Sequence, residues 1–183
     1  MDKIALSKTM AYALRHDPDA YGLILDESGW VSVNALLVAL TGRFPGVTAA
    51  DLQSVVTEST QQRYEIDAGR IRAGYGHSTD SRIEQTPDMP PEVLFHGTPA
   101  KTADAIEEEG LRSMGRQYVH LSSTPEIALT VGARNGKAPV IFAIDATAAH
   151  NDGIVFYSTT DPNTWLVESV PPTYLARTQF GSV

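Results

Sequence analysis

The chain has 183 residues, of which 42% are hydrophobic, a formal net charge of −8 and no cysteine. This composition suits a globular core in one large domain or two small lobes, and it excludes disulfides and a cysteine nucleophile. No apolar run approaches the roughly 20 residues that cross a bilayer, and charged residues interrupt the N-terminus where a signal peptide has its apolar segment, so we expect a cytoplasmic protein.

The charges are spread evenly along the chain, with eight basic and twelve acidic residues before Met89 and six basic and ten acidic residues after it. Neither half is basic, so any contact with a nucleic acid should involve only a few phosphates. The five histidines form no closely spaced pair of the kind that binds metals, and we predict no metal site.

The first predicted helix runs from about Asp2 to Arg15, because its apolar residues recur at helical spacing, and the proline of Asp17-Pro18 ends it. Arg15 and His16 fall at its C-terminal end. That end of a helix carries partial negative charge, so compensation of the helix dipole is the simplest role for both cations.

Further along, a turn at residues 26–28 precedes a helix that Ser32 can cap, and Thr48 with Asp51 resembles a capping box at the start of a third helix. Residues 63–67 and 70–72, joined by Ala68-Gly69, predict a β-hairpin. Helices followed by a hairpin suggest a winged-helix-like lobe. Such lobes also serve as protein interaction modules, so the architecture alone does not imply nucleic acid.

The stretch from Arg70 to Ser78 combines cationic, flexible and titratable residues directly after a strand-like run. On a strand, Arg70 and Arg72 project from one face, so both guanidinium groups would face one ligand. Gly74 and Gly76 would let the backbone turn sharply and approach that ligand closely. The stretch predicts a phosphate-binding site, and the alternative is a solvated hairpin edge followed by a glycine turn.

A proline-rich, mostly polar segment from Thr79 to Glu92 predicts a linker, with a lobe boundary near residue 88. Beyond it, the pattern predicts an α+β lobe. Its strands are expected at residues 93–98, 118–122, 139–144, 154–157 and 164–167, with helices starting at Pro99 and at Thr124-Pro125.

Several motifs, in order and at proper spacing over nearly the whole chain, resemble the RNA (tRNA) 2′-phosphotransferase family. They are Leu14-Arg15-His16, Gly29-Trp30-Val31, Gln62-Arg63-Tyr64, Ile71-Arg72-Ala73, Gly76-His77-Ser78, Phe95-His96-Gly97-Thr98, the run from Ile106 to Leu111, Val119-His120-Leu121-Ser122, the run from Arg134 to Val140, and the run from Trp165 to Pro172. The chain departs from the family at Tyr64, where Phe is common, and at Tyr75, where Gln is common.

The resemblance implies a winged-helix-like RNA-binding lobe at residues 1–88 and an ADP-ribosyltransferase-like, NAD-binding lobe at residues 89–183. It also implies a transferase of tRNA splicing, expected here as a monomer, that moves an internal RNA 2′-phosphate to NAD. A phosphate oxygen attacks C1″ of the NAD ribose and nicotinamide leaves; the ribose 2″-hydroxyl then attacks phosphorus. The products are RNA with a free 2′-hydroxyl, ADP-ribose 1″,2″-cyclic phosphate and nicotinamide.

The same resemblance assigns residues to roles, and it puts the active site in a cleft between the two lobes. The family's essential quartet maps onto Arg15, His16, Arg72 and Arg134, where arginines would grip the phosphoryl oxygens. The residues implied in NAD binding are His96, Gly97, Thr98, His120, Leu121 and Ser122, with Gly97 allowing close backbone approach. Those implied in holding the RNA phosphate are Arg63, His77 and Ser78.

Two other functions fit parts of the pattern. An ADP-ribosyltransferase that caps terminal phosphates of RNA or DNA would keep the fold and stop after the first step. A non-enzymatic winged-helix module would bind nucleic acid or protein only, although the expected basic face is missing.

Overall fold

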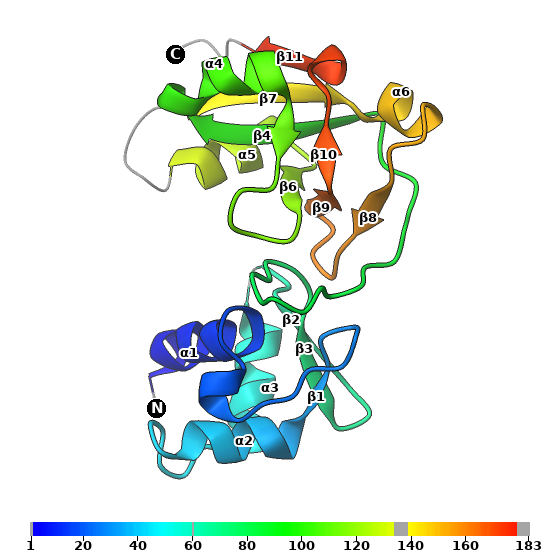
Figure 1. Ribbon diagram of the computed structural model, residues 1–183. Coiled ribbons are helices and arrows are strands. Elements are labelled where there is room, and N and C mark those ends of the chain that lie inside the picture. The colour runs from blue at the N-terminus through cyan, green and yellow to red at the C-terminus, as the bar shows by residue number, and fades with distance from the viewer. Residues whose placement is uncertain (1, 60, 134–138, 179–183) are drawn as a thin grey trace. The chain divides into compact units, whose positions relative to one another are not determined.

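The computed structural model describes residues 2–59, 61–133 and 139–178 (Figure 1). Its contacts divide the chain into two compact units. Unit 1 comprises Met1–Gln85 and Gly115–Gln117, and unit 2 comprises Thr86–Met114 and Tyr118–Val183. Each unit combines helices with antiparallel sheets, which confirms the predicted α+β class.

Unit 1 packs helices against a three-stranded sheet with strand order β1-β3-β2, in which both pairings are antiparallel. Val31 of β1 pairs with Ile71 of β3, and both side chains are buried. The elements, in chain order, are α1 (Lys3–Arg15), the 3-10 helix η1 (Asp19–Tyr21), β1 (Val31–Ser32), α2 (Val33–Thr41), α3 (Ala49–Glu58), β2 (Tyr64–Asp67) and β3 (Arg70–Ala73).

Side-chain caps define the starts of these helices. The predicted cap at Ser32 accepts a hydrogen bond from the Ala35 N–H, and the predicted capping box of Thr48 and Asp51 is present with both of its hydrogen bonds. The first helix begins at Lys3 rather than Asp2, because the Asp2 carboxylate caps it from outside. These local patterns therefore fix where the helices begin.

The predicted hairpin is confirmed as β2 and β3. Its two turn residues, Ala68 and Gly69, have φ values of 45° and 76°, as a tight two-residue hairpin turn requires. The pairing aligns Glu65 with Arg72, which puts these opposite charges side by side on one face.

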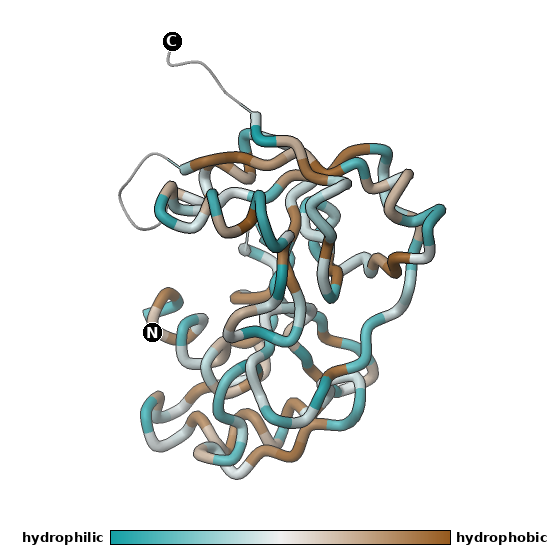
Figure 2. The backbone as a smooth tube through the Cα atoms, turned by 45° about the horizontal axis from the view of Figure 1, so that its top comes forward, coloured by the Kyte–Doolittle hydropathy of each residue, from teal (hydrophilic) through white to brown (hydrophobic). Residues whose placement is uncertain are grey.

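The core of unit 1 is made by the apolar faces of its helices and the inner face of its sheet. Figure 2 shows that hydrophobic and hydrophilic stretches alternate along the backbone. The fully buried side chains include Leu6, Met10, Leu14, Leu36, Leu40, Leu52 and Ile71.

Unit 2 is built on a six-stranded antiparallel sheet with strand order β11-β7-β4-β6-β9-β8, and a two-stranded sheet pairs β10 with β5. Its core includes Leu94, Leu121, Ile144, Phe156 and Val167. The elements are β4 (Val93–Pro99), α4 (Ala100–Glu109), β5 (Leu111–Arg112), β6 (Val119–Ser122), α5 (Pro125–Gly132), β7 (Pro139–Asp145), α6 (Ala146–Asn151), β8 (Phe156–Ser158), β9 (Thr164–Val167), β10 (Ser169–Val170), η3 (Pro172–Tyr174) and β11 (Leu175–Thr178).

The structure adds elements that the sequence pattern did not predict. These include the short helix α6, the 3-10 helices η1 and η3, and the strands β5, β10 and β11, which are too short or too polar to show a clear period. The strand expected at residues 154–157 begins two residues later, at Phe156. None of the helices within the described residues is both long and apolar enough to traverse a bilayer.

The predicted linker, residues 79–92, contains no helix or strand, but its first part packs in unit 1. Ile83 is 2% exposed, and the Glu84 N–H donates to the Glu27 carbonyl at 2.8 Å. The buried Ile83 and this hydrogen bond anchor the first part of the segment, although its average hydrophobicity is low.

The glycine at position 97 is required by the packing of α5 on β4. A Cβ at Gly97 would lie 2.0 Å from the Ala128 carbonyl oxygen, and one at Gly132 would lie 2.6 Å from the Pro139 Cβ. Close backbone approach at Gly97 therefore serves a helix of the same unit.

We predict that Gly97→Ala destabilises the protein by about 1–3 kcal/mol, because the added methyl group overpacks this contact. The free energy of unfolding in urea measures the loss. Gly115→Ala is the matched control, since no heavy atom lies within 4 Å of its Cβ position. Equal stability of the two variants would contradict the packing role.

Candidate functional site

Arg15, the last residue of α1, places its guanidinium group between two aromatic rings of unit 1. The guanidinium carbon lies 5.6 Å from the Tyr64 ring centroid and 5.1 Å from that of Tyr75, and Nη2 donates to the Arg63 carbonyl at 3.3 Å. Burial lowers the Arg15 pKa, and its Nε has no hydrogen-bond partner. Among the described residues, no carboxylate pairs with this cation. Its positive charge is therefore available to an anionic ligand.

His16 follows directly and joins the same cluster. Its Nδ1 is hydrogen-bonded to the Ser78 Oγ at 2.8 Å, and the Ser78 N–H donates to the Arg15 carbonyl at 2.8 Å. Burial lowers the His16 pKa, and the charges of Arg15 and Arg116 lower it further. The exposed imidazole thus sits in a positive field that an arriving anion would relieve.

The loop from Gly74 to Ser78 wraps closely around Arg15. Gly76 has a φ of 90°, a backbone conformation in which any side chain would be strained. A Cβ there would lie at van der Waals distance, 3.5 Å, from the Cδ and Nη1 of Arg15. His77 is only 3% exposed and its Nε2 has no hydrogen-bond partner. The His77 side chain is therefore buried beneath the loop. Ser78, in contrast, is exposed beside His16.

A residue that the sequence interpretation missed, Arg116, belongs to this cluster. Its charge lowers the pKa of both Arg15 and His16. Arg116 comes from the segment Gly115–Gln117, which belongs to unit 1 although it lies between β5 and β6 in the chain. Its position directly before the Gln-Tyr-Val-His-Leu-Ser run was the only available sequence signal.

Gln117 fixes this segment in unit 1. Its Oε1 accepts from the Ile83 N–H at 2.9 Å, and its Nε2 donates to the carbonyls of Thr79 at 2.9 Å and Ser81 at 2.8 Å. The Gln117 N–H donates to the His77 carbonyl at 3.0 Å. Because the side-chain amide satisfies both donor and acceptor groups of the loop, it holds the neighbouring Arg116 near α1.

Arg63 and Arg72, two further arginines of the predicted site, differ in their surroundings. The charge of Arg63 lowers the Arg15 pKa, so it contributes to the positive field. Arg72 instead donates from Nε and Nη2 to the Glu65 carboxylate at 2.9 and 2.8 Å, and its guanidinium lies 4.6 Å from the Trp30 ring centroid. Its charge is therefore largely neutralised within the protein.

Arg70 and Arg72 do project from one face of β3, as predicted, because both guanidinium groups pack on the Trp30 ring. Arg70 lies 4.9 Å from that ring centroid and 3.5 Å from the Asp26 carboxylate. The two groups thus contact a ring and two acids of the same unit. The cluster that the structure brings together consists of Arg15, His16, Arg63, Ser78 and Arg116; we call it the cation cluster.

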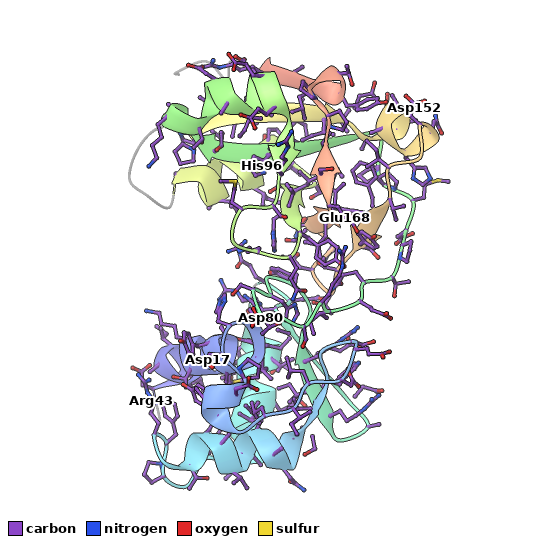
Figure 3. All side chains as sticks on the ribbon, in the orientation of Figure 1. Asp17, Arg43, Asp80, His96, Asp152 and Glu168 are labelled. Carbon is purple, nitrogen blue, oxygen red and sulfur yellow. The ribbon has the colours of Figure 1, made fainter. Side chains whose placement is uncertain are left out.

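In unit 2, the residues predicted to bind a cofactor lie on the neighbouring strands β4 and β6, where Phe95 pairs with Ser122. The His96 Nδ1 is 3.0 Å from the His120 carbonyl oxygen, and burial lowers the His96 pKa. Figure 3 shows His96 on the sheet of this unit. The antiparallel pairing therefore gathers the two histidine motifs, which are 24 residues apart.

These residues differ in exposure. Leu121 is 1% exposed and belongs to the core, while Thr98 and Ser122 are 5% and 8% exposed. The Thr98 Oγ1 is hydrogen-bonded to the Thr102 Oγ1 at 2.7 Å. His96 and His120 are the half-buried side chains of the group. Arg134, the remaining predicted residue, lies outside the described residues.

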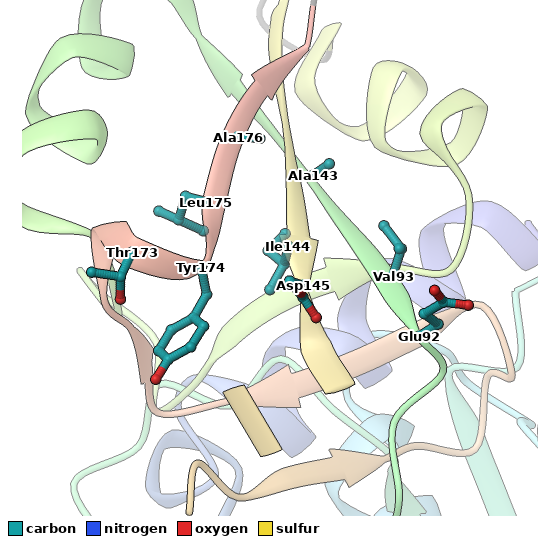
Figure 4. Close-up of a pocket in the computed structure, with 9 residues that line it drawn as sticks. All are labelled: Glu92, Val93, Ala143, Ile144, Asp145, Thr173, Tyr174, Leu175 and Ala176. Carbon is teal, nitrogen blue, oxygen red and sulfur yellow. The ribbon is translucent and has the colours of Figure 1, made fainter. Parts of the chain in front are cut away.

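A groove of about 290 Å³ in unit 2 lies apart from all of these residues (Figure 4). It is lined by Glu92, Val93, Ala143, Ile144, Asp145, Thr173, Tyr174, Leu175 and Ala176. Within the part of the chain that the structure describes, no three His, Asp or Glu side chains are grouped so that they could hold a metal ion.

Comparison with known proteins decides the family. The sequence model described as RNA 2′-phosphotransferase, Tpt1/KptA family, matches residues 1–169. The chain belongs to the RNA 2′-phosphotransferase family. It is therefore an enzyme of the transferase class.

Similar proteins of this family occur in several bacteria. A probable RNA 2′-phosphotransferase of Acetivibrio thermocellus is 45% identical over 177 residues, which cover 96% of this chain and 97% of that protein. One of Nostoc punctiforme is 45% identical over 177 residues, covering 95% and 96%. One of Streptomyces griseus is 40% identical over 181 residues, covering 94% and 95%. The similarity thus includes both units.

The buried His77 makes a prediction about pH. Burial, followed by the charges of Arg15, His16 and Arg72, lowers its pKa to about 4 in the folded protein. In the unfolded chain the His77 imidazole is protonated as the pH falls below about 6.5, whereas in the folded chain it stays neutral down to a pH of about 4. The stability that depends on neutral His77 is complete above pH 6.5 and is lost as the pH falls toward 4, by about 3 kcal/mol.

Unfolding in urea at a series of pH values measures this loss, with His77→Gln as the comparison. The variant should show a shallower fall in stability between pH 7 and pH 4, since a glutamine has no proton to gain. Parallel curves for the two proteins would contradict the neutral, buried state of His77.

Proposed function

We propose that the protein is an NAD-dependent RNA 2′-phosphotransferase that removes an internal 2′-phosphate of the kind left at a tRNA splice junction. The observation that carries the proposal is the cation cluster, in which Arg15 has no carboxylate partner among the described residues. A concentrated positive field in a chain of net charge −8 suits a ligand with one doubly charged group. A single RNA 2′-phosphate is such a group.

The proposed reaction has two steps. An oxygen of the 2′-phosphate attacks C1″ of the NAD ribose, and the bond to nicotinamide breaks. The 2″-hydroxyl of that ribose then attacks phosphorus, and the RNA 2′-oxygen leaves and takes up a proton. Negative charge develops on the phosphoryl group in the second step, where preorganised cationic donors stabilise it.

We assign the phosphate to the cation cluster of unit 1. Arg15, Arg63 and Arg116 supply planar donor groups for its oxygens, and His16 supplies an imidazole N–H. The Ser78 hydroxyl orients the His16 ring through their hydrogen bond. The resemblance already implied Arg63 in holding the phosphate. In this assignment Arg116 joins it, and Arg72 has a smaller role than the resemblance gave it, because Arg72 pairs with Glu65.

We assign NAD to unit 2, at the strands that carry His96 and His120. The proximity of the two motifs supports this assignment, and Arg134 remains a proposed phosphoryl contact. We further propose that unit 1 is a winged-helix-like lobe, since its order is helix, strand, two helices and a two-stranded hairpin. The six-stranded unit 2 would be the ADP-ribosyltransferase-like lobe.

The activity assay uses an oligoribonucleotide with one internal 2′-phosphate, incubated with the protein and NAD. We expect RNA with a free 2′-hydroxyl and ADP-ribose 1″,2″-cyclic phosphate, both identified by mass spectrometry. An oligonucleotide without the 2′-phosphate is the control. Absence of turnover at saturating NAD would refute the proposal. ADP-ribose left on a terminal phosphate would instead indicate the capping activity.

Substitution of single arginines tests the phosphate assignment. Arg63→Ala and Arg116→Ala should each lower kcat/KM by about 10²- to 10³-fold, as expected for a lost contact to the transition state. Arg72→Ala should lower it less, because Glu65 already neutralises that charge. Arg43→Ala is the matched control, since this exposed arginine packs on Phe44.

The opposite pattern would overturn the assignment. If Arg72→Ala lowered kcat/KM severely and Arg116→Ala left it near normal, the phosphate would have to be assigned to the face of β3 that carries Arg72. The unfolding midpoint of each variant separates lost contacts from lost stability.

A further inference from the structure

Three ring side chains lie together at the C-terminal end of α1, next to the cation cluster. The Tyr12 ring centroid is 6.0 Å from that of His16 and 6.3 Å from that of Tyr21, with interplanar angles of 50° and 60°. Tyr12 is 48% exposed, and His16 is exposed as well. The His16 ring therefore belongs both to this aromatic group and to the phosphate-binding residues.

The packing of α1 explains why the Tyr12 ring stays outside the core. The helix buries Leu6, Met10, Ala13 and Leu14, which form its inner face. Tyr12 stands one turn before His16, so both rings occupy the same outer face. Tyr12 is not among the residues that pack on the core cluster of unit 1 in the described part of the chain, and it contacts that core through Tyr21.

The neighbouring turn holds Tyr21 in place. The Asp17 carboxylate accepts from the Ala20 N–H at 3.1 Å, and the Tyr21 N–H donates to the Pro18 carbonyl at 3.0 Å. Figure 3 marks Asp17 at this end of α1. The hydrogen-bonded turn thus holds the Tyr21 ring against the Tyr12 ring.

We propose that Tyr12, supported by Tyr21, stacks on the nucleobase of the RNA nucleotide whose 2′-phosphate His16 contacts. This inference rests on the proposed function. The base and the 2′-phosphate are attached to adjacent carbons of one ribose, so a phosphate at His16 brings its own base to the ring one helical turn away. Every base has a π-face, so stacking holds substrates of any sequence.

The charge beside the rings favours a base over more of the RNA backbone. The Tyr12 hydroxyl and the Asp17 carboxylate oxygen are 3.5 Å apart, so an acid borders the hydroxyl end of the ring. A second phosphate there would be repelled, whereas an uncharged base is not. The aromatic group would therefore bind the base of a nucleotide, and the cation cluster would bind its 2′-phosphate.

The test measures binding in the absence of NAD. Two 2′-phosphorylated trinucleotides are compared, one with a base on the phosphorylated nucleotide and one abasic at that position. We expect wild-type protein to bind the complete trinucleotide roughly tenfold more tightly than the abasic one, the size of one stacking contact. Tyr12→Ala should lose that preference and bind both equally.

Two variants serve as controls. Tyr12→Phe keeps the ring and should retain the preference. Ile4→Ala removes a side chain that is 70% exposed on the same helix and should leave both affinities unchanged. If Tyr12→Ala weakened both trinucleotides equally, or neither, the stacking proposal would be overturned.

The outcomes also separate this inference from the proposed function. A Tyr12-dependent preference for the base without turnover in the presence of NAD would keep the stacking contact and refute the phosphotransferase reaction. Turnover without any preference for the base would keep the phosphotransferase reaction and refute the stacking contact. With wild-type turnover, Tyr12→Ala should raise KM and leave kcat unchanged, because the contact is equal in ground and transition states.

Discussion

Holding the Arg15 guanidinium in a partly desolvated position is the interaction on which the rest of unit 1 depends. Removing a cation from water is costly unless other groups replace its hydration. Here Tyr64 and Tyr75 present their rings and the Arg63 backbone presents a carbonyl, so α1, the start of β2 and the loop after β3 must converge on one point. None of these groups is a carboxylate, and the charge is stabilised without being neutralised. That arrangement leaves a cation whose natural complement is an anion from outside.

The surroundings of Arg15 follow from this constraint. Gly76 gives the loop a backbone conformation that passes close to the guanidinium, and His77 packs beneath as a neutral group because burial and neighbouring cations oppose its protonation. Gln117 then ties a distant segment to the same loop and brings Arg116 toward His16. Local positive charge is thus concentrated in a chain that is acidic as a whole, which favours recognition of one phosphate over a long nucleic-acid backbone.

Unit 2 depends on a different constraint, the close contact of α5 with β4. Because Gly97 has no side chain, the backbone of α5 reaches the sheet at Ala128. In that sheet β4 pairs with β6 on one side and β7 on the other. That pairing joins His96 to the His120 carbonyl. Gly97 therefore has a packing role, although its position between His96 and Thr98 suggested only a contact with a ligand.

The sequence by itself determined the α+β class, the caps at Ser32 and Thr48, the hairpin through Ala68-Gly69 and the family, because each is encoded in a few neighbouring residues or in ordered motifs. It also singled out Arg15 and His16 as candidate site residues, and the structure joins both to Ser78 by hydrogen bonds. Only the tertiary structure decided that Arg72 pairs with Glu65, that His77 is buried, and that Arg116 joins the cluster. The physical reason is that pairing, burial and electric field depend on residues distant in the chain, and their positions are set by packing rather than by local pattern.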